Sequence, residues 1–305
     1  MGATNDSVSP GTWGALTPRR SRGLLRDAWR RLLSSTTGRI GLVLVSFILV
    51  VAIIPPLVAP YDPYTDSNLA KYLEPPSWEN PFGTDRLGRS VLRRIVYGAN
   101  ISLRVGVLAV LLSTTVGTAL GLLAGYFGGL VDNVIMRLMD ILLAFPAMLL
   151  AIAIVAVRGI GLTNTMLAIS IVGVAGPARV VRSMVLSIRE RDYIDAARMV
   201  GARSGRIILR HIFPNTLSPI IVQMTMGIGG AILMAAALGF LGLGAVPPQP
   251  EWGAMISDGI PFLRPGTGQA PWLVFFPGMA IMLSVLGFNL LGDGLRDALD
   301  PQMTI

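Results

Sequence analysis

Apolar residues fill most of this chain in long runs that charged residues rarely interrupt. A helix needs roughly 20 such residues to cross the hydrocarbon core of a bilayer, and a soluble domain would rarely contain several uncharged runs of that size. The runs predict six transmembrane helices, at residues 38–59, 101–125, 133–157, 162–181, 215–245 and 272–293. We therefore expect an all-α integral membrane protein with six transmembrane helices.

The segment that precedes the first run, residues 1–37, is polar. Residues 1–23 are rich in Ser, Thr, Gly and Pro, a composition typical of disorder. Residues 24–36 place apolar side chains on one helical face and arginines elsewhere, which predicts an amphipathic helix on the inner membrane surface. A helical extension of the first span is the alternative. The long leader and the lack of an A-x-A site favour an uncleaved anchor at 38–59.

Arginine and lysine are unevenly distributed among the polar segments. Residues 1–39 contain seven of them and residues 179–210 contain eight. Segments rich in these residues tend to stay on the cytoplasmic side of a membrane. We therefore expect a multi-pass plasma-membrane protein whose two termini are cytoplasmic, together with the loop at 185–214 and the tail at 294–305.

This orientation leaves two sizeable segments, residues 60–100 and 246–271, on the extracytoplasmic side. Both contain turn-forming residues and tryptophans. We expect the first of them to end in a short interfacial helix, Leu87–Tyr97. Both are candidate docking surfaces for an extracytoplasmic partner, with ordinary connecting loops as an equally good interpretation.

The composition excludes several kinds of function. The chain has no cysteine and one histidine, His211, which excludes disulfides, cysteine metal sites and an HExxH zinc pair. Lys71 is the one lysine and follows Ala70, so no GxxxxGK[ST] phosphate loop exists and any ATP must be bound by another subunit. The net charge of +8 could suggest nucleic acid. The arginines lie beside the ends of apolar runs, however, which favours a lipid membrane and no nucleic-acid partner.

A polar insert, "YIDAARMVGARSGRIILRHIFPN" at residues 193–215, separates two of the most apolar stretches. Asp192 is a suitable N-cap for a first helix, and Gly201 can terminate that helix. A second helix is expected at Ser204–Ile212, after which Pro214 resets the chain before the fifth span. The insert thus predicts a compact helix, glycine, helix unit close to the membrane.

The small and basic residues of this insert suggest a contact surface. Ala196 and Ala197 let a partner approach the backbone closely. The arginines that are available to acidic groups or to inner-leaflet lipid are Arg198, Arg203, Arg206 and Arg210. An ordinary arginine-rich inner loop is the alternative interpretation.

The insert also resembles a known family motif. Asp195, Ala196 and Ala197, followed by Gly201, Ile207 and Pro214, resemble the EAA motif of binding-protein-dependent ABC importer permeases. In that family the segment contains a coupling helix that sits in a cleft of a cytoplasmic ATPase. This sequence departs from the motif by having Asp195 in place of Glu and Phe213 before the proline.

Three further stretches strengthen the resemblance. They are "FGTDRLGRS" at 82–90, "LGLGAVPPQPEWGAMI" at 241–256 and "FNLLGDGLRDALDP" at 288–301. Together they resemble the C-type permeases of dipeptide and oligopeptide importers, the DppC/OppC group, over residues 38–302. The resemblance implies a type I ABC importer permease fold with its core at 101–293, which forms half of the translocation pathway for short peptides.

The resemblance also implies a set of partners. These are a B-type permease subunit that forms a heterodimer with this chain, two ATP-binding subunits that hold ATP and Mg, and an extracytoplasmic substrate-binding protein. The chain itself would then have no catalytic residue, no metal and no cofactor. A permease of a related nickel or glutathione importer is the first alternative, and a secondary transporter is the second.

The fifth predicted span contains small residues at helical spacing: Gly227, Gly230, Ala231, Ala235, Gly239 and Gly242. Such spacing allows close helix contact in membranes. It predicts a face that packs against the partner permease or lines its pathway, with packing inside this chain as an equal alternative.

Four residues of the third and fourth spans raise specific expectations. Asp140 follows Arg137 by three residues, so we expect these two to pair on one helix face. Pro146 and Pro177 are expected to kink their helices.

Overall fold

The computed structural model describes residues 24–58, 61–62, 65–264 and 269–299. Within these ranges the chain is mostly helical, and its β structure is one isolated bridge between Thr84 and Ser90. The helices are α1 (Leu24–Ser34), α2 (Thr36–Val58), α3 (Val91–Phe127), α4 (Gly129–Ala144), α5 (Ala147–Arg158), α6 (Leu162–Gly173), α7 (Ala175–Arg189), α8 (Asp192–Met199), α9 (Ser204–Ile207), α10 (Phe213–Phe240), α11 (Trp252–Gly259) and α12 (Trp272–Leu299). Three short segments complete the list: 3₁₀ turns η1 (Leu69–Lys71) and η3 (Ile260–Leu263), and π-helical η2 (Ile208–Ile212).

The described part of the chain contains five helical runs long and apolar enough to cross a membrane, or six if the bent pair α4 and α5 counts as one span. The five are Thr36–Ile54, Val91–Phe127, Leu162–Arg189, Ser204–Phe240 and Trp272–Leu299. The predicted all-α membrane architecture is confirmed. The predicted disorder of residues 1–23 lies outside the described residues.

The third predicted span is not one straight helix. α4 and α5 meet at an angle of 93° around Phe145 and Pro146. A proline disfavours the helical conformation in the residue before it, and Phe145 is accordingly extended. The expected kink at Pro146 is thus a complete break.

The fourth and fifth predicted spans are longer than hydropathy suggests. The fourth continues through α7 to Arg189. The expectation that Pro214 resets the chain is wrong, because α9, η2 and α10 form one continuous run from Ser204. Pro214 lies in the first turn of α10, where the missing N–H is tolerated, and the π-helical turn η2 precedes it.

The interfacial helix expected at Leu87–Tyr97 does not form. Leu87 lies in a turn, and Ser90 bridges to Thr84. From Val91 onward the chain is already in α3, which continues without interruption to Phe127.

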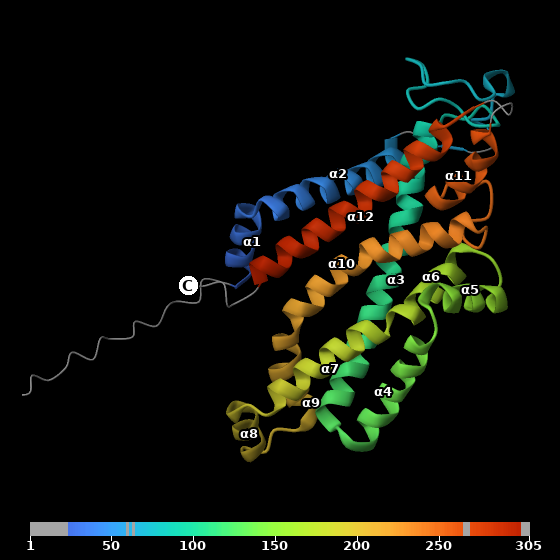
Figure 1. The fold of residues 1–305 in the computed structure, drawn as a ribbon. Coiled ribbons are helices and arrows are strands. Elements are labelled where there is room, and N and C mark those ends of the chain that lie inside the picture. Colours follow the sequence, from blue (N-terminus) through green and yellow to red (C-terminus); the bar gives the residue numbers. More distant parts are fainter. Residues whose placement is uncertain (1–23, 59–60, 63–64, 265–268, 300–305) are drawn as a thin grey trace, which may run out of the picture.

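The centre of the fold is α3, which crosses between the other long helices and packs against α2, α6, α7 and α10 (Figure 1). α12 lies between α2 and α10. The contact of α3 with α7 is especially close because Gly117, Gly121 and Gly125 recur at four-residue spacing. A Cβ at these positions would lie 2.5–2.7 Å from the nearest atom of the α7 segment. Such small-residue spacing is a common basis of helix association in membranes.

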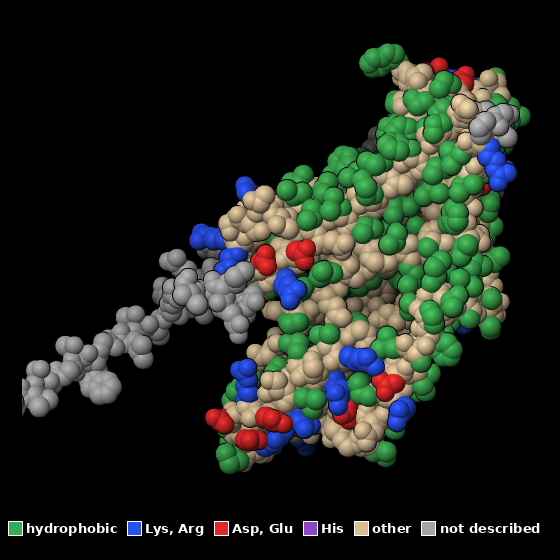
Figure 2. All heavy atoms as spheres, viewed as in Figure 1, with side chains coloured by type: hydrophobic (Ala, Val, Ile, Leu, Met, Phe, Trp, Pro, Cys, Tyr) green, Lys and Arg blue, Asp and Glu red, His purple; other side chains and the backbone are tan. Residues whose placement is uncertain are grey.

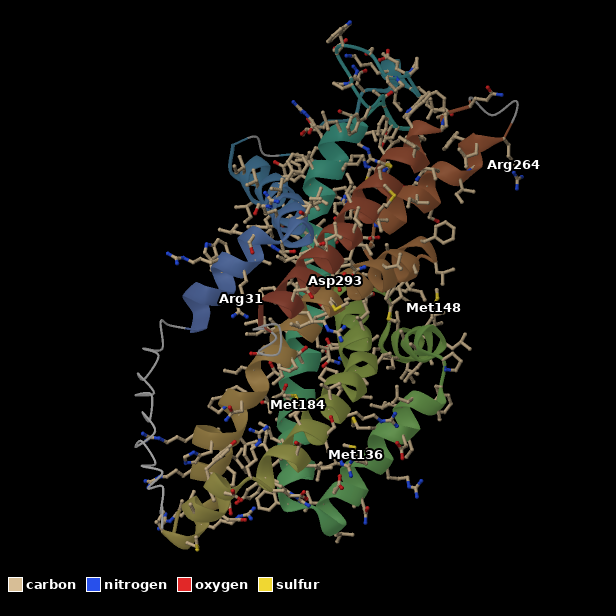
Figure 3. All side chains as sticks on the ribbon, turned by 60° about the vertical axis from the view of Figure 1, so that its left-hand side comes forward. Arg31, Met136, Met148, Met184, Arg264 and Asp293 are labelled. Atoms are coloured by element: carbon tan, nitrogen blue, oxygen red, sulfur yellow. The ribbon has the colours of Figure 1, made fainter. Side chains whose placement is uncertain are left out.

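Two ion pairs join α4 to α7. Asp140 accepts a hydrogen bond of 2.6 Å from Nη2 of Arg179, so the expected pair with Arg137 is wrong. Asp132 accepts two hydrogen bonds from the guanidinium of Arg182. Figure 3 labels Met136 on α4 and Met184 on α7, which mark the two helices that these pairs connect.

Charged side chains gather at the ends of the molecule, while hydrophobic side chains cover much of the long helices (Figure 2). One end carries α1, α8, α9 and the end of α12, and we call it the basic end. The other end carries the described residues of four segments, 61–62, 65–90, 241–264 and 269–272, and we call it the loop end. At the basic end Leu32 of α1 is buried against Gly38 of α2 and Gly294 of α12. Figure 3 labels Arg31 and Asp293 on the neighbouring helices α1 and α12. The helix expected at 24–36 forms at Leu24–Ser34 and is separated from α2 at Ser35, while its position on the membrane surface stays a prediction.

Candidate functional site

The polar insert folds into a compact unit at the basic end, which we call the basic unit: residues 190–212, comprising α8, α9, η2 and their connections. Arg191 occupies the N-cap position of α8, so the expected N-cap, Asp192, is instead in the first turn. Asp192 and Asp195 still favour the helix there, because negative charge near a helix N-terminus interacts well with its dipole.

Gly201 ends α8, as the sequence predicts. Its φ of +77° lies in the left-handed region that glycine adopts without strain. Its N–H bonds the carbonyl of Arg198 at 2.9 Å, and the N–H of Ala202 bonds the carbonyl of Ala197 at 3.0 Å. This pair of hydrogen bonds is a Schellman motif, which satisfies the carbonyls at the helix end.

The basic unit is anchored to the long helices by buried isoleucines. Ile194 of α8, Ile207 of α9 and Ile212 of η2 are at most 1% exposed. With Ile208 of η2 they belong to one apolar cluster, which we call the isoleucine cluster. Its other buried members come from α3, α7 and α10: Leu122, Val181, Val185, Ile188 and Ile220. Burial of each such side chain contributes about 1.5–3 kcal/mol, so the unit is tied firmly to three helices.

The opposite face of α8 is open. Met199 and Val200 are 83% and 84% exposed, which is unusual for adjacent apolar residues. Ala196 is exposed beside them. Asp195 and Arg198 form an exposed ion pair of 2.9 Å, and the guanidinium carbon of Arg198 lies 6.0 Å from the ring centre of Tyr126. The unit therefore combines a rigid base with an accessible tip of mixed apolar and charged character.

The residues predicted for this site divide into two groups. Those exposed at the surface are Asp195, Ala196, Arg198, Gly201, Arg203, Arg206, Arg210 and Pro214. Ala197 is half-buried against the isoleucine cluster, and Ile207 is buried within it. These two residues hold the unit in place rather than presenting a surface.

The small residues predicted to form a stripe on the fifth span have different surroundings in the structure. Ala231 and Ala235 pack in a cluster with residues of α3, α5 and α6. A Cβ on Gly239 would lie 2.0 Å from the carboxylate of Glu251, and one on Gly227 would lie 3.4 Å from Val110. A Cβ on Gly230 would meet nothing within 4 Å among the described residues, and Gly242 has a φ of +78° after the helix end. The stripe therefore includes packing positions, an open position and a turn.

The loop end contains a buried ionic cluster that the sequence interpretation missed. Oδ2 of Asp85 accepts hydrogen bonds of 2.8 Å from both Nε of Arg89 and Nη1 of Arg94, and Oδ1 accepts the N–H groups of Leu87 and Arg89. The three charged side chains are at most 6% exposed. Asp258 of α11 lies 3.6 Å from Arg94 and extends the cluster to a second segment.

Glu251 is a second buried acid at the loop end. Its carboxylate accepts the N–H groups of Gly253 and Ala254 and thereby caps α11. Burial raises the pKa of this carboxyl from 4.5 to about 7, although those two hydrogen bonds and one with Ser102 oppose the rise. The neighbouring Trp252 donates to the carbonyl of Ile95 at 2.9 Å, which ties α11 to α3.

The sequence of the chain matches two known protein families. Residues 117–305 match the family described as binding-protein-dependent transport system inner membrane component, and residues 23–76 match the N-terminal transmembrane domain of oligopeptide transport permease C. The dipeptide transport system permease protein DppC of Alkalihalophilus pseudofirmus is 52% identical over 91% of this chain and 90% of its own length.

Two other relatives cover nearly the same span. DppC of Haemophilus influenzae is 43% identical over 97% of this chain and 99% of that protein. The glutathione transport system permease protein GsiD of Pectobacterium atrosepticum is 44% identical over 91% of each chain. The chain therefore belongs to the family of binding-protein-dependent transport system inner membrane components, as a multi-pass membrane permease similar to those named for dipeptide and glutathione transport.

Proposed function

We propose that this chain is one permease subunit of an ATP-driven importer of short peptides and that the basic unit is its contact with an ATPase subunit. The observation that supports this role is the arrangement of α8: Ile194 fixes it to the isoleucine cluster, while Ala196, Met199 and Val200 face outward. A surface of this kind can receive force from a partner and pass it to three long helices.

The proposed assembly contains a B-type permease that completes the pathway, two ATP-binding subunits that hold ATP and Mg, and an extracytoplasmic binding protein. It is supported by membership of a binding-protein-dependent family and by the absence of a phosphate-binding loop from this sequence. Both termini and the basic unit are on the cytoplasmic side in this proposal, in line with the arginine distribution.

The orientation can be tested with single cysteines, because the natural chain has none. Trp78 at the loop end and Met199 at the basic end are both strongly exposed. A membrane-impermeant thiol reagent should label Trp78→Cys in intact spheroplasts, and should label Met199→Cys only after the membrane is opened. The reverse pattern would refute the orientation.

The coupling role can be tested by changing the exposed face alone. Ala196→Arg adds a bulky charge to the tip of α8, and it should abolish stimulation of ATP hydrolysis by the peptide-loaded binding protein while the chain still inserts. Ala196→Ser, which keeps the side chain small, is the matched control and should couple normally. Gly201→Pro should also uncouple, because proline cannot adopt the φ of +77° found here. Normal coupling in both Ala196→Arg and Gly201→Pro would disprove this role.

Dipeptide is the preferred cargo because the named relatives include dipeptide permeases at 43–52% identity. A glutathione importer is the second candidate, since GsiD proteins are similarly close. Uptake of labelled dipeptide, glutathione and nickel by the assembled complex, each with its candidate binding protein, distinguishes these cargoes. Uptake of glutathione or nickel without dipeptide would replace the peptide assignment.

A further inference from the structure

A hollow of 240 Å³ opens between α3, α6, α7 and α10. It lies near the middle of three long apolar runs, Val91–Phe127, Leu162–Arg189 and Ser204–Phe240. In Figure 2 the surface is hollowed where the limbs formed by α10 and α7 diverge. Its volume is many times the roughly 10–15 Å³ that one water molecule requires. An open space of this size at mid-depth must hold water, lipid, a partner helix or cargo.

The helical hydrogen-bond pattern is interrupted between α6 and α7, beside this hollow. α6 ends at Gly173 and α7 begins at Ala175, and the N–H of Val174 turns back to the carbonyl of Ile171. Pro177 has no N–H to offer to the carbonyl of Gly173, four residues earlier. Broken helices at the membrane midplane commonly leave backbone groups available to a transported substrate.

Small residues at this break make room for polar side chains. A Cβ on Gly173 would lie 3.1 Å from Cβ of Ser113, and a Cβ on Gly176 would lie 3.3 Å from Nε2 of Gln223. Both contacts are tighter than ordinary packing, so a larger residue would displace the serine or the amide. Glycine at these positions therefore keeps the two polar side chains beside the hollow.

The amide of Gln223 is incompletely satisfied. Its Oε1 is buried and has no hydrogen-bond partner among the described residues. A buried acceptor without a donor costs free energy, because it has given up its hydrogen bonds to water. The last torsion of a glutamine side chain is broad. The amide can therefore turn toward the hollow when a donor arrives there.

The lining of the hollow indicates which ligand would suit it. Ser113, Thr114 and Gln223 are its polar side chains, and no charged side chain is among the described residues that line it. A charged group at this depth would need an opposite charge, whereas a neutral amide would not. The side chain of glutamine carries one carbonyl and two N–H donors, which complement the N–H and C=O of a peptide group.

We propose that this hollow is a water-filled cargo subsite in which Gln223 exchanges hydrogen bonds with a main-chain peptide group of the passing peptide. The proposal rests on the proposed function, because it requires that short peptides pass through this permease. It assigns peptide recognition to a neutral amide at mid-depth and leaves the charged ends of the peptide to other parts of the assembly.

Cysteine labelling in the complete importer tests whether the hollow is wet. Gln223→Cys should react with a water-soluble methanethiosulfonate reagent, and a dipeptide supplied with binding protein and ATP should slow the reaction at least fivefold. Thr225→Cys is the control, because Thr225 is buried and its hydroxyl bonds the carbonyl of Ile221 in its own helix. Absence of labelling at position 223 throughout turnover would mean that lipid or a partner helix fills the hollow, and would overturn the proposal.

Transport measurements test the role of the amide. Gln223→Met keeps the length of the side chain but removes the amide, and it should lower dipeptide uptake about tenfold, as expected for the loss of about 1.4 kcal/mol. Thr225→Val should stay within twofold of the natural protein. If the natural importer moves dipeptide but Gln223→Met moves it equally well, this inference fails alone. If the natural importer moves no peptide, the proposed function fails with it.

A bulky side chain placed in the hollow gives an independent test of whether cargo passes through it. Gly230 is exposed and has open space where its Cβ would be, so Gly230→Leu should fit and obstruct the hollow. It should assemble normally and import less than one-tenth of the natural amount. Gly278→Leu is the matched control, since Gly278 in α12 also has open space. Full import by Gly230→Leu would count against a cargo route through this hollow.

Discussion

Shortening Ile194 to alanine tests whether the basic unit is held stiffly enough to transmit a movement. Ile194 is the buried residue of α8 and is 0% exposed in the isoleucine cluster. Replacing a buried isoleucine by alanine costs about 2–5 kcal/mol. Reversing a two-state population from 1:99 to 99:1 requires about 5.5 kcal/mol. The lost anchoring energy is therefore comparable with the free energy that the proposed coupling must transmit, and α8 should yield before the long helices move.

The assay compares ATP hydrolysis with and without peptide-loaded binding protein in the reconstituted importer. Ile194→Ala should keep basal hydrolysis but lose at least four-fifths of the stimulation. Hydrogen exchange of the α8 amides should become faster, because local opening costs less free energy. Met199→Ala is the matched control, since it shortens an apolar side chain that is 83% exposed. It should raise the ATPase concentration needed for assembly and retain full stimulation once the ATPase is in excess.

Two results would contradict this reasoning. Normal stimulation together with fast exchange would mean that a loose α8 still couples, so stiffness is not required. Normal exchange would mean that Ile194 does not anchor α8, and the burial argument would then be wrong.

Three further predictions concern the loop end and α10. Asp85→Asn should destabilise the protein by about 3–5 kcal/mol in thermal unfolding, because it leaves the buried guanidinium groups of Arg89 and Arg94 without this carboxylate. Arg93→Ala, which removes an exposed ion pair with Asp66, should cost less than about 1 kcal/mol. The pKa of Glu251 is about 7 in the folded protein against 4.5 ordinarily, so the folded state loses about 3 kcal/mol of stability as pH rises from 4.5 to 7. Glu251→Gln should remove this part of the pH dependence of the melting temperature. An identical pH dependence in the variant would exclude Glu251 as its source. Gly239→Ala puts a methyl 2.0 Å from the carboxylate of Glu251 and should cost about 1–3 kcal/mol, while Gly230→Ala should be neutral or slightly stabilising because its site is open.

The sequence is sufficient to predict those parts of the structure that depend on local chemistry. Long apolar runs predicted the membrane helices, and Gly201 predicted the end of α8 because a left-handed position after a helix favours glycine. Hydropathy did not predict the break at Pro146, since a window over residues 133–157 averages composition and carries no information on direction. The proline itself was visible, so its effect on the preceding residue was the available signal.

Long-range pairing was beyond the reach of local reasoning. The three-residue spacing on a helix predicts a pair between Asp140 and Arg137, but the structure pairs Asp140 with Arg179, which is 39 residues away. In the cluster around Asp85, the four-residue spacing to Arg89 is visible in the sequence, but the burial of the pair and the approach of Arg94 depend on how the loop folds onto α3. The spacing of glycines in α3 was also readable in advance as a small-residue contact motif.

The described contacts suggest which parts of the permease move together. α3 has 37 residues, or about 55 Å of helix. Its first turns hold Arg94 in the cluster at the loop end, and its last turns supply Leu122 to the isoleucine cluster at the basic end. Between them, Gly121 brings α3 so close to α7 that sliding would force backbone atoms together. We therefore expect α3, α7, the basic unit and the first turns of α10 to move as one body, because α10 continues from η2 and supplies Ile220 to the isoleucine cluster. Relative movement is easiest on the side of α10 that faces the hollow, where Gly230 has open space and Gly176 meets only the end of the Gln223 side chain. A push on α8 would then change the width of the hollow rather than the contact between α3 and α7.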